Sequence, residues 1–137
     1  MRALLAALAV SAAYPGAWAT FAPRSFFADF PGAGRHWTAG LPAYSEHLVT
    51  DVGAFYLAFA LLFAWAAWRP SRELVVPVCS AFALFSAIHL VWHSAHLDGF
   101  ATFDAVAQTA SLAAVLLASA GAAVVAARGR VNGAGEG

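Results

Sequence analysis

The stretch that decides the fold is residues 48–96, LVTDVGAFYLAFALLFAWAAWRPSRELVVPVCSAFALFSAIHLVWHSAH. It holds an apolar run at residues 48–68, a polar turn at residues 69–73 and a second apolar run at residues 74–96. A helix rises about 1.5 Å per residue, and the hydrocarbon core of a bilayer is about 30 Å thick. Each run is therefore long enough to cross a membrane, and the stretch predicts two antiparallel spanning helices.

Two more runs of this kind lie outside the stretch, one toward each end of the chain. Backbone groups in lipid must be paired within their own segment, and the runs are too long for the alternating strands of a membrane barrel. The sequence therefore predicts an all-α integral membrane four-helix bundle, antiparallel and up-down, in a single domain of residues 1–130. The expected helices cover about residues 3–22, 48–68, 74–96 and 104–127, and a flexible C-terminal tail is expected at residues 131–137.

A short segment between the first two spanning helices is expected to lie in the membrane interface. Residues 23–30 begin with a proline, which suits a first helical turn, and carry Phe26, Phe27 and Phe30 on one side. The sequence PGAG at residues 31–34 then interrupts the helix.

The composition excludes several classes of protein. The chain of 137 residues is 62% hydrophobic and 10% charged, whereas a soluble domain is about 45–50% apolar and about 25% charged. Seven arginines and no lysines balance seven acids, so the chain has no basic excess and we do not expect it to bind nucleic acid. The high apolar content indicates instead that its partner is the lipid bilayer. The single Cys79 excludes an intramolecular disulfide framework and a zinc ribbon.

The arginines predict the orientation in the membrane, because arginine is favoured on the cytoplasmic side. Five of them fall on one side of the four-helix path and two on the other: Arg2, Arg69, Arg72, Arg128 and Arg130 against Arg24 and Arg35. We therefore expect both termini in the cytoplasm. Abundant alanine with arginine in place of lysine is typical of a GC-rich bacterial genome, so we expect a multi-pass protein of the bacterial plasma membrane.

The first apolar run also fits a secretory signal peptide. Arg2, an apolar stretch and the small-residue pattern Ala17-Trp18-Ala19 would place a cleavage site after residue 19. The apolar run continues through Phe21 and Ala22, which favours a retained spanning helix. The orientation of the other three helices is the same in both interpretations.

Polar residues inside the apolar runs recur at helical spacing. His89, His93 and His96 fall on one face of the third spanning helix at about 100° per residue. His47 and Asp51 are four residues apart on the second helix, and the fourth carries the set Asp104, Gln108 and Ser111. Ionisable groups in membrane helices are costly and usually face the interior of a bundle.

The short connections predict which of these residues share a depth. Positions on the second and third helices whose numbers sum to about 142 should be level, as should positions on the third and fourth that sum to about 201. Two polar layers in the outer half of the membrane follow. The inner layer is Asp51, His89, His93 and Gln108, and the outer layer is Glu46, His47, His96, Asp98 and Asp104.

Three kinds of chemistry fit these layers. His89, His93 and Asp51 could bind a divalent metal, because imidazole and carboxylate are standard ligands of zinc, iron and copper. A haem could lie between His47 and a histidine of the third helix, and His–Asp pairs suit a proton-linked or quinone-type site. Hydrogen bonds between such residues also join helices without any ligand.

The sequence favours a non-enzymatic accessory or ligand-binding membrane protein. The alternatives are a metal- or haem-binding redox protein and a proton-coupled carrier. The candidate ligand-binding residues are Glu46, His47, Asp51, His89, His93, His96, Asp104 and Gln108.

Two apolar repeats have simpler interpretations. Phe55, Phe59 and Phe63 recur every four residues, which is typical of bulk between packed helices. Small residues also recur every four positions on the fourth helix, where they allow close approach of another helix. This small-residue face predicts a homo-oligomer or a membrane-protein partner, and its residues are Ala110, Ala114, Ala118, Ala122 and Ala126, with Gly121 beside them.

The chain resembles the small four-helix membrane proteins grouped as DoxX-like. The resemblance runs over most of the chain and is carried by APRSFF at residues 22–27, EHLVTDVGAFYLA at residues 46–58 and HLVWH at residues 89–93. It implies the four-helix membrane fold. No catalytic motif of that group transfers to a position of this sequence.

Overall fold

The computed structural model describes residues 1–41 and 43–129. Over these residues the fold is all-helical, as predicted, apart from a two-stranded hairpin. The elements are α1 Arg2–Phe21, α2 Pro23–Asp29, β1 Pro31–Gly32, β2 Arg35–His36, α3 Glu46–Trp68, α4 Arg72–Ser94 and α5 Thr102–Arg128. The expected tail at residues 131–137 and Arg130 lie outside the described residues.

Four of these helices, α1, α3, α4 and α5, are long and apolar enough to cross a membrane, counted over the described part of the chain. The short helix expected at residues 23–30 is α2. The third spanning helix is as long as expected but lies two residues earlier in the chain: α4 runs from Arg72 to Ser94, so His96 lies beyond its end. The chain turns toward α5 here, where Gly99 has a φ of +87°.

The turn between α3 and α4 follows from local chemistry. α3 ends at Trp68, just before a proline that cannot donate a backbone hydrogen bond. The Ser71 side chain then accepts a hydrogen bond from the backbone N–H of Leu74 at 3.3 Å and caps α4. Glu73 lies in the first turn of α4, where a negative charge is favourable.

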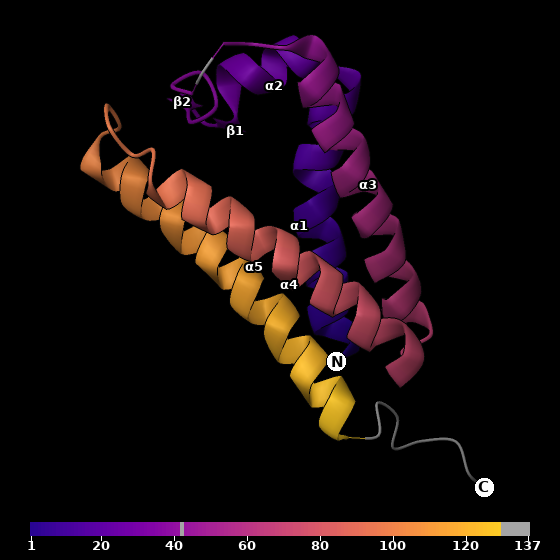
Figure 1. The fold of residues 1–137 in the computed structure, drawn as a ribbon. Coiled ribbons are helices and arrows are strands. Elements are labelled where there is room, and N and C mark those ends of the chain that lie inside the picture. The colour runs from indigo at the N-terminus through magenta and orange to yellow at the C-terminus, as the bar shows by residue number, and fades with distance from the viewer. Residues whose placement is uncertain (42, 130–137) are drawn as a thin grey trace, which may run out of the picture.

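The four long helices form two pairs, which Figure 1 shows as the two limbs of a V. In one pair, named here the first arm, α1 packs against α3; in the other, the second arm, α4 packs against α5. The arms meet near the α3–α4 turn and diverge toward the opposite end. The bundle therefore has a closed end and an open end.

The core lies at the closed end. Phe63 and Phe82 are almost completely buried, with ring centroids 5.0 Å apart, and Val75 and Leu5 lie in the same cluster. Farther out, Phe59 lies 4.9 Å from Phe82. This pair sums to 141, so the predicted register of the second and third helices is confirmed where they touch.

Two glycines allow α1 and α3 to approach closely. A Cβ on Gly53 would lie 2.5 Å from Thr20 Oγ1 and 2.6 Å from the Thr20 backbone nitrogen. A Cβ on Gly16 would lie 2.9 Å from the Leu57 backbone nitrogen. The close packing of α1 against α3 thus depends on having glycine at both positions.

The small-residue face of α5 is divided between the inside and the outside of the molecule. Ala122 and Ala126 are buried in the core, whereas Ala110 and Ala114 are exposed. Gly121 is exposed too, and a Cβ there would meet nothing within 4 Å.

The open end is covered by residues 23–41, named here the cap, which contain α2 and the β1–β2 hairpin. Ala33 and Gly34, with φ values of +54° and +72°, form the two-residue hairpin turn between β1 and β2. The cap is attached to α1 by hydrogen bonds from Tyr14 Oη to the Pro31 carbonyl oxygen at 3.0 Å and from Trp18 Nε1 to Ser25 Oγ at 3.2 Å.

Candidate functional site

The polar side chains of α4 form a column that begins at the aromatic contact between the arms. Phe85 lies 5.5 Å from Tyr56 of α3, measured between ring centroids. His89 stacks on Phe85 at 5.3 Å with an interplanar angle of 19°, and His93 lies 4.4 Å beyond His89. Each step of four residues turns about 40° around the helix, so the column begins against the first arm at Phe85 and ends against α5 at His93.

His93 connects this column to α5. Its Nδ1 lies 3.3 Å from Oε1 of Gln108, and the two positions sum to the predicted 201. The Gln108 side chain is only 2% exposed. Its amide nitrogen, Nε2, is buried and has no hydrogen-bond partner among residues 1–41 and 43–129.

Asp104 lies one helical turn from Gln108 on the same side of α5, and it connects this arm to the cap. Its Oδ1 accepts hydrogen bonds from Arg35 Nη1 and from Trp37 Nε1, both at 2.8 Å. The Arg35 guanidinium also lies 4.3 Å from the centre of the Phe103 ring. The cap thus bridges the open end, attached to α1 on one side and to α5 on the other.

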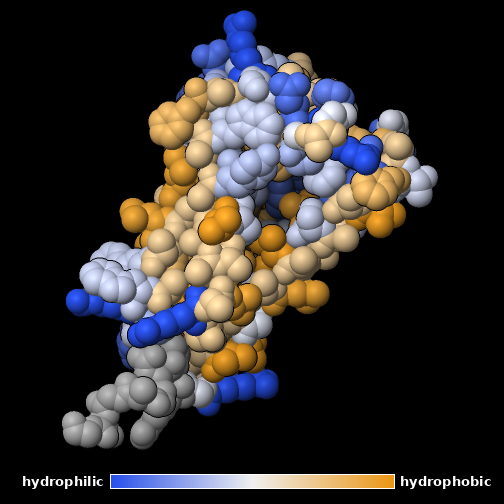
Figure 2. All heavy atoms as spheres, turned by 180° about the vertical axis from the view of Figure 1, so that it is seen from behind, coloured by the Kyte–Doolittle hydropathy of each residue, from blue (hydrophilic) through white to orange (hydrophobic). Residues whose placement is uncertain are grey.

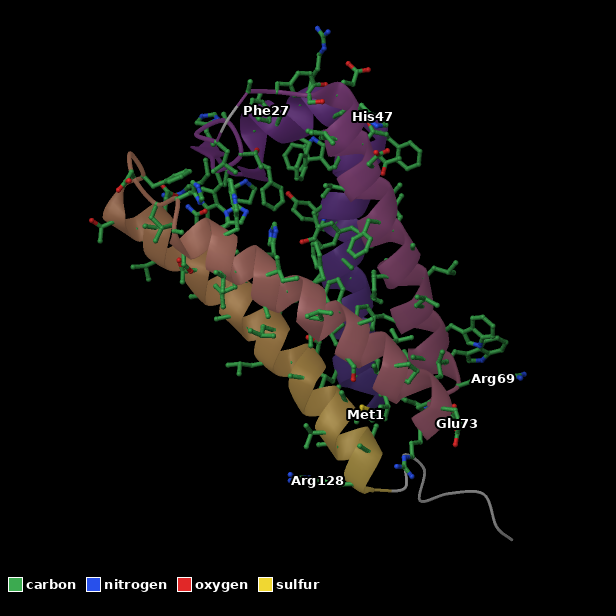
Figure 3. The ribbon with its side chains drawn as sticks, in the orientation of Figure 1. Met1, Phe27, His47, Arg69, Glu73 and Arg128 are labelled. Atoms are coloured by element: carbon green, nitrogen blue, oxygen red, sulfur yellow. The ribbon has the colours of Figure 1, made fainter. Side chains whose placement is uncertain are left out.

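The other predicted residues are not part of this group. His47 Nε2 lies 3.3 Å from Asp51 Oδ2, and the two side chains are 82% and 61% exposed. Figure 3 shows His47 at the open end of the first arm, in the first turn of α3. Glu46 contacts Arg24 at 3.7 Å, and His96 stacks on Trp92 at 4.1 Å.

The predicted inner layer is therefore assembled only in part. His89, His93 and Gln108 come together, but Asp51 pairs with His47 instead. Residues of α3 and α4 at the same depth are in contact only where the two arms touch. At the level of Asp51 the arms have already diverged.

No three His, Cys, Asp or Glu side chains within the described ranges lie close enough together to hold a metal ion. The expected metal set of His89, His93 and Asp51 is not gathered in this arrangement. His47 lies 3.3 Å from Asp51, and both side chains are largely exposed; a haem between His47 and a histidine of the third helix stays a prediction.

A cavity of about 430 Å³ lies beneath the cap, between the outer end of α3 and the side of α4. Its size falls in the range of small-molecule sites, about 300–1,000 Å³. Trp92 is its wall on α4, and the edge of that indole lies against His93 at 5.2 Å. The remaining lining comes from the cap, the following loop and α3: Phe26, Phe27, Thr38, Leu41, Ala43, Ser45, Leu48, Val49 and Val52.

Seen from behind, the molecule is hollowed between the two arms, as Figure 2 shows. The space at the open end is thus bounded by the arms and by the cap above them.

Sequence reasoning missed the cavity and the partners of Asp104. Arg35 and Trp37 stand almost 70 residues before Asp104, and no spacing rule links a loop to a distant helix end. The phenylalanines of residues 23–30 were the one signal in the sequence for the cavity, because a cluster of large apolar side chains is expected to pack over another part of the molecule.

Comparison of the chain with protein-family models, with curated proteins and with solved structures finds no match. The resemblance to the DoxX-like group therefore stays a prediction.

Proposed function

We propose that this small multi-pass membrane protein binds an apolar or amphiphilic molecule taken from the lipid phase. The observation that carries the proposal is the cavity of about 430 Å³ shared by the cap, α3 and α4. It lies at the open end, where the arms do not fill the space between them.

The chemistry of the walls supports a lipid-phase ligand. Leu48, Val49 and Val52 of α3 face Trp92 of α4, and phenylalanines of the cap close the top. Such walls bury hydrocarbon well and offer little to a hydrophilic solute. Because α3 and α4 both cross the apolar layer, a molecule dissolved in the membrane reaches the cavity without passing through water.

The proposal includes an orientation. Arg69 at the α3–α4 turn and Arg128 at the end of α5 gather with Met1 at the closed end of the molecule, as Figure 3 shows. The positive-inside rule supports a closed end in the cytoplasm and an open end on the outer side of a bacterial plasma membrane. The ligand is then collected from the outer leaflet.

The test uses 1,12-dibromododecane, because bromine quenches an indole that it touches. Purified full-length protein in nanodiscs should show saturable quenching superimposed on the linear quenching caused by probe dissolved in the lipid. Trp92→Phe should remove the saturable component, because Trp92 is the tryptophan of the cavity wall.

A matched pair of variants checks the position of the site. Val52→Phe fills the cavity from α3 and should abolish saturable quenching. Val125→Phe makes the same change on the exposed surface of α5 and should leave it intact. Purely linear quenching in the unmodified protein would overturn the proposed function.

A further inference from the structure

The cavity beneath the cap has walls on both arms. Trp92 is the lining residue that α4 contributes, and the other described lining residues lie in the cap, the following loop or α3. The distance between these walls is therefore set by where the second arm stands relative to the first arm and the cap. A hydrocarbon is bound through close contact, so a wall that moves outward weakens its binding.

Packing within the arms does not set this distance at the open end. α1 packs extensively against α3, and α4 against α5, whereas contacts between the arms are few and the core that joins them lies at the closed end. Figure 1 shows the arms diverging from that end, with the cap placed between α1 and the outer end of the second arm. The cap is thus the part of the described chain that can hold the second arm in place at the open end.

One carboxylate oxygen joins the cap to the second arm by hydrogen bonds. Asp104 Oδ1 accepts from Arg35 Nη1 and from Trp37 Nε1, both at 2.8 Å. Charge-assisted hydrogen bonds of this length are strong and directional. The Phe100 ring also lies against Gly40 of the cap, but a van der Waals contact is less directional. Arg35, Trp37 and Asp104 are named here the strap.

The second arm carries a movement of Asp104 to Trp92. Gln108 lies one turn beyond Asp104 on α5, and its Oε1 lies 3.3 Å from Nδ1 of His93 on α4. The centre of the His93 ring in turn lies 5.2 Å from that of Trp92, edge to face. Because α4 and α5 also pack extensively against each other, the second arm moves as one body. A shift of Asp104 away from the cap therefore moves Trp92 away from the opposite wall.

We propose that the strap positions Trp92 against the cavity and so retains the lipid-phase ligand. When the strap opens, the cavity loses its α4 wall and the ligand returns to the membrane. Asp104 is a positioning residue, because it acts through the second arm. This inference rests on the proposed function, since it concerns the retention of the same ligand.

The first test is the affinity for 1,12-dibromododecane, read as the concentration at the midpoint of saturable quenching in nanodiscs of the full-length protein. Asp104→Ala should raise this midpoint about tenfold, the loss expected when a hydrocarbon gives up about 50 Å² of contact with a wall. Asp98→Ala is the matched control. It removes an exposed carboxylate from the turn between α4 and α5 and should leave the midpoint unchanged.

A charge exchange separates the role of the ion pair from a general loss of structure. Asp104→Arg places two guanidinium groups together and should raise the midpoint at least as much as Asp104→Ala. Adding Arg35→Asp restores opposite charges at the two positions and should bring back most of the lost affinity. A midpoint that stays high in the double variant would refute the strap.

The second test measures the separation of the arms by pulsed dipolar electron paramagnetic resonance. Spin labels are attached through Phe21→Cys and Val106→Cys in a Cys79→Ser background. Both residues are exposed, and they lie toward the open ends of α1 and α5. Asp104→Ala should broaden the distance distribution toward longer distances, and the charge exchange should narrow it again.

The outcomes distinguish this inference from the proposed function. If the unmodified protein shows no saturable quenching, the proposed function fails and retention by the strap fails with it. If quenching saturates with the same midpoint in Asp104→Ala, the cavity binds its ligand but the strap is refuted. A higher midpoint with an unchanged distance distribution refutes the strap as well, because the second arm then has not moved.

Discussion

Gly53 is the residue on which the first arm depends most directly. Its missing side chain lets α3 contact the backbone of α1 at Thr20, where even a Cβ would stand 2.5 Å from the threonine hydroxyl oxygen. Backbone atoms cannot move aside as a flexible side chain can, so the helices would have to separate.

We therefore expect Gly53→Ala to lower the free energy of unfolding by about 1–3 kcal/mol, the usual cost of overpacking. Unfolding in mixed micelles with increasing dodecyl sulfate, followed by circular dichroism, measures it. Gly121→Ala is the control, because a Cβ there meets nothing within 4 Å; it should stabilise the helix by about 0.5–1 kcal/mol. Equal effects at the two positions would contradict the close crossing.

Asp104 is the residue that attaches the cap to the second arm. Its side chain is 19% exposed, and one oxygen accepts from both Arg35 and Trp37. Removing the acceptor leaves the Arg35 guanidinium and the Trp37 indole N–H without it, so the cap loses its attachment to α5.

Asp104→Ala should therefore loosen the cap more than the bundle. Limited trypsin digestion should cut after Arg35 several times faster in this variant, while the helical circular dichroism signal stays the same. Asp98→Ala removes an exposed carboxylate near the same end and should not change the cutting rate. A cap that is cut equally fast in all three proteins would contradict the bridging role of Asp104.

At the scale of the elements, aromatic side chains hold α3 to α4. Phe82 of α4 is 1% exposed and contacts Phe59 and Phe63 of α3 at centroid distances of 4.9 and 5.0 Å. These rings therefore join α3 to α4 at the closed end, where α1 also contacts α5.

Phe82→Ala should lower the free energy of unfolding by about 3–5 kcal/mol, the range for a large buried aromatic side chain. Leu84→Ala, two residues along the same helix, changes a side chain that is 65% exposed and should have a much smaller effect. The same dodecyl sulfate titration compares them. A loss as large at Leu84 as at Phe82 would place the junction of the arms elsewhere.

The packing of α1 favours a retained helix over a cleaved signal peptide. It buries Leu5, Leu8 and Ala12 and packs against the glycine face of α3. Cleavage after residue 19 would remove this contact from the first arm. We expect the membrane-inserted protein to retain residues 1–19, and mass spectrometry of the N-terminal peptide checks this; a peptide beginning at Thr20 would show that α1 is removed.

At the scale of the whole molecule, the closed and open ends should lie on opposite sides of the membrane. Ala39 is an exposed residue of the cap, and Ala127 is exposed at the end of α5. In a Cys79→Ser background, a membrane-impermeant maleimide should label Ala39→Cys in intact cells and Ala127→Cys only after permeabilisation. The reverse pattern would invert the proposed orientation.

The sequence predicted the structure best where neighbouring segments determine the geometry. Helix register across a short connection is almost fixed by the connection itself, so His93 opposite Gln108 and Phe59 opposite Phe82 follow from counting residues. The same counting failed to place Asp51, because it gives depth along two helices and not the angle between them. His96 was misplaced for a smaller reason, since the end of α4 depends on how the chain turns toward α5.

What the sequence determines by itself is therefore the set of membrane-length helices and their order. Apolar length and the need to pair every backbone group in lipid leave no other solution. The divergence of the arms, the cap across the open end and the hydrogen bonds of Asp104 to the cap belong to the tertiary structure. These features depend on side-chain packing between distant segments, such as Gly53 on Thr20 and Arg35 on Asp104, which no periodic pattern encodes.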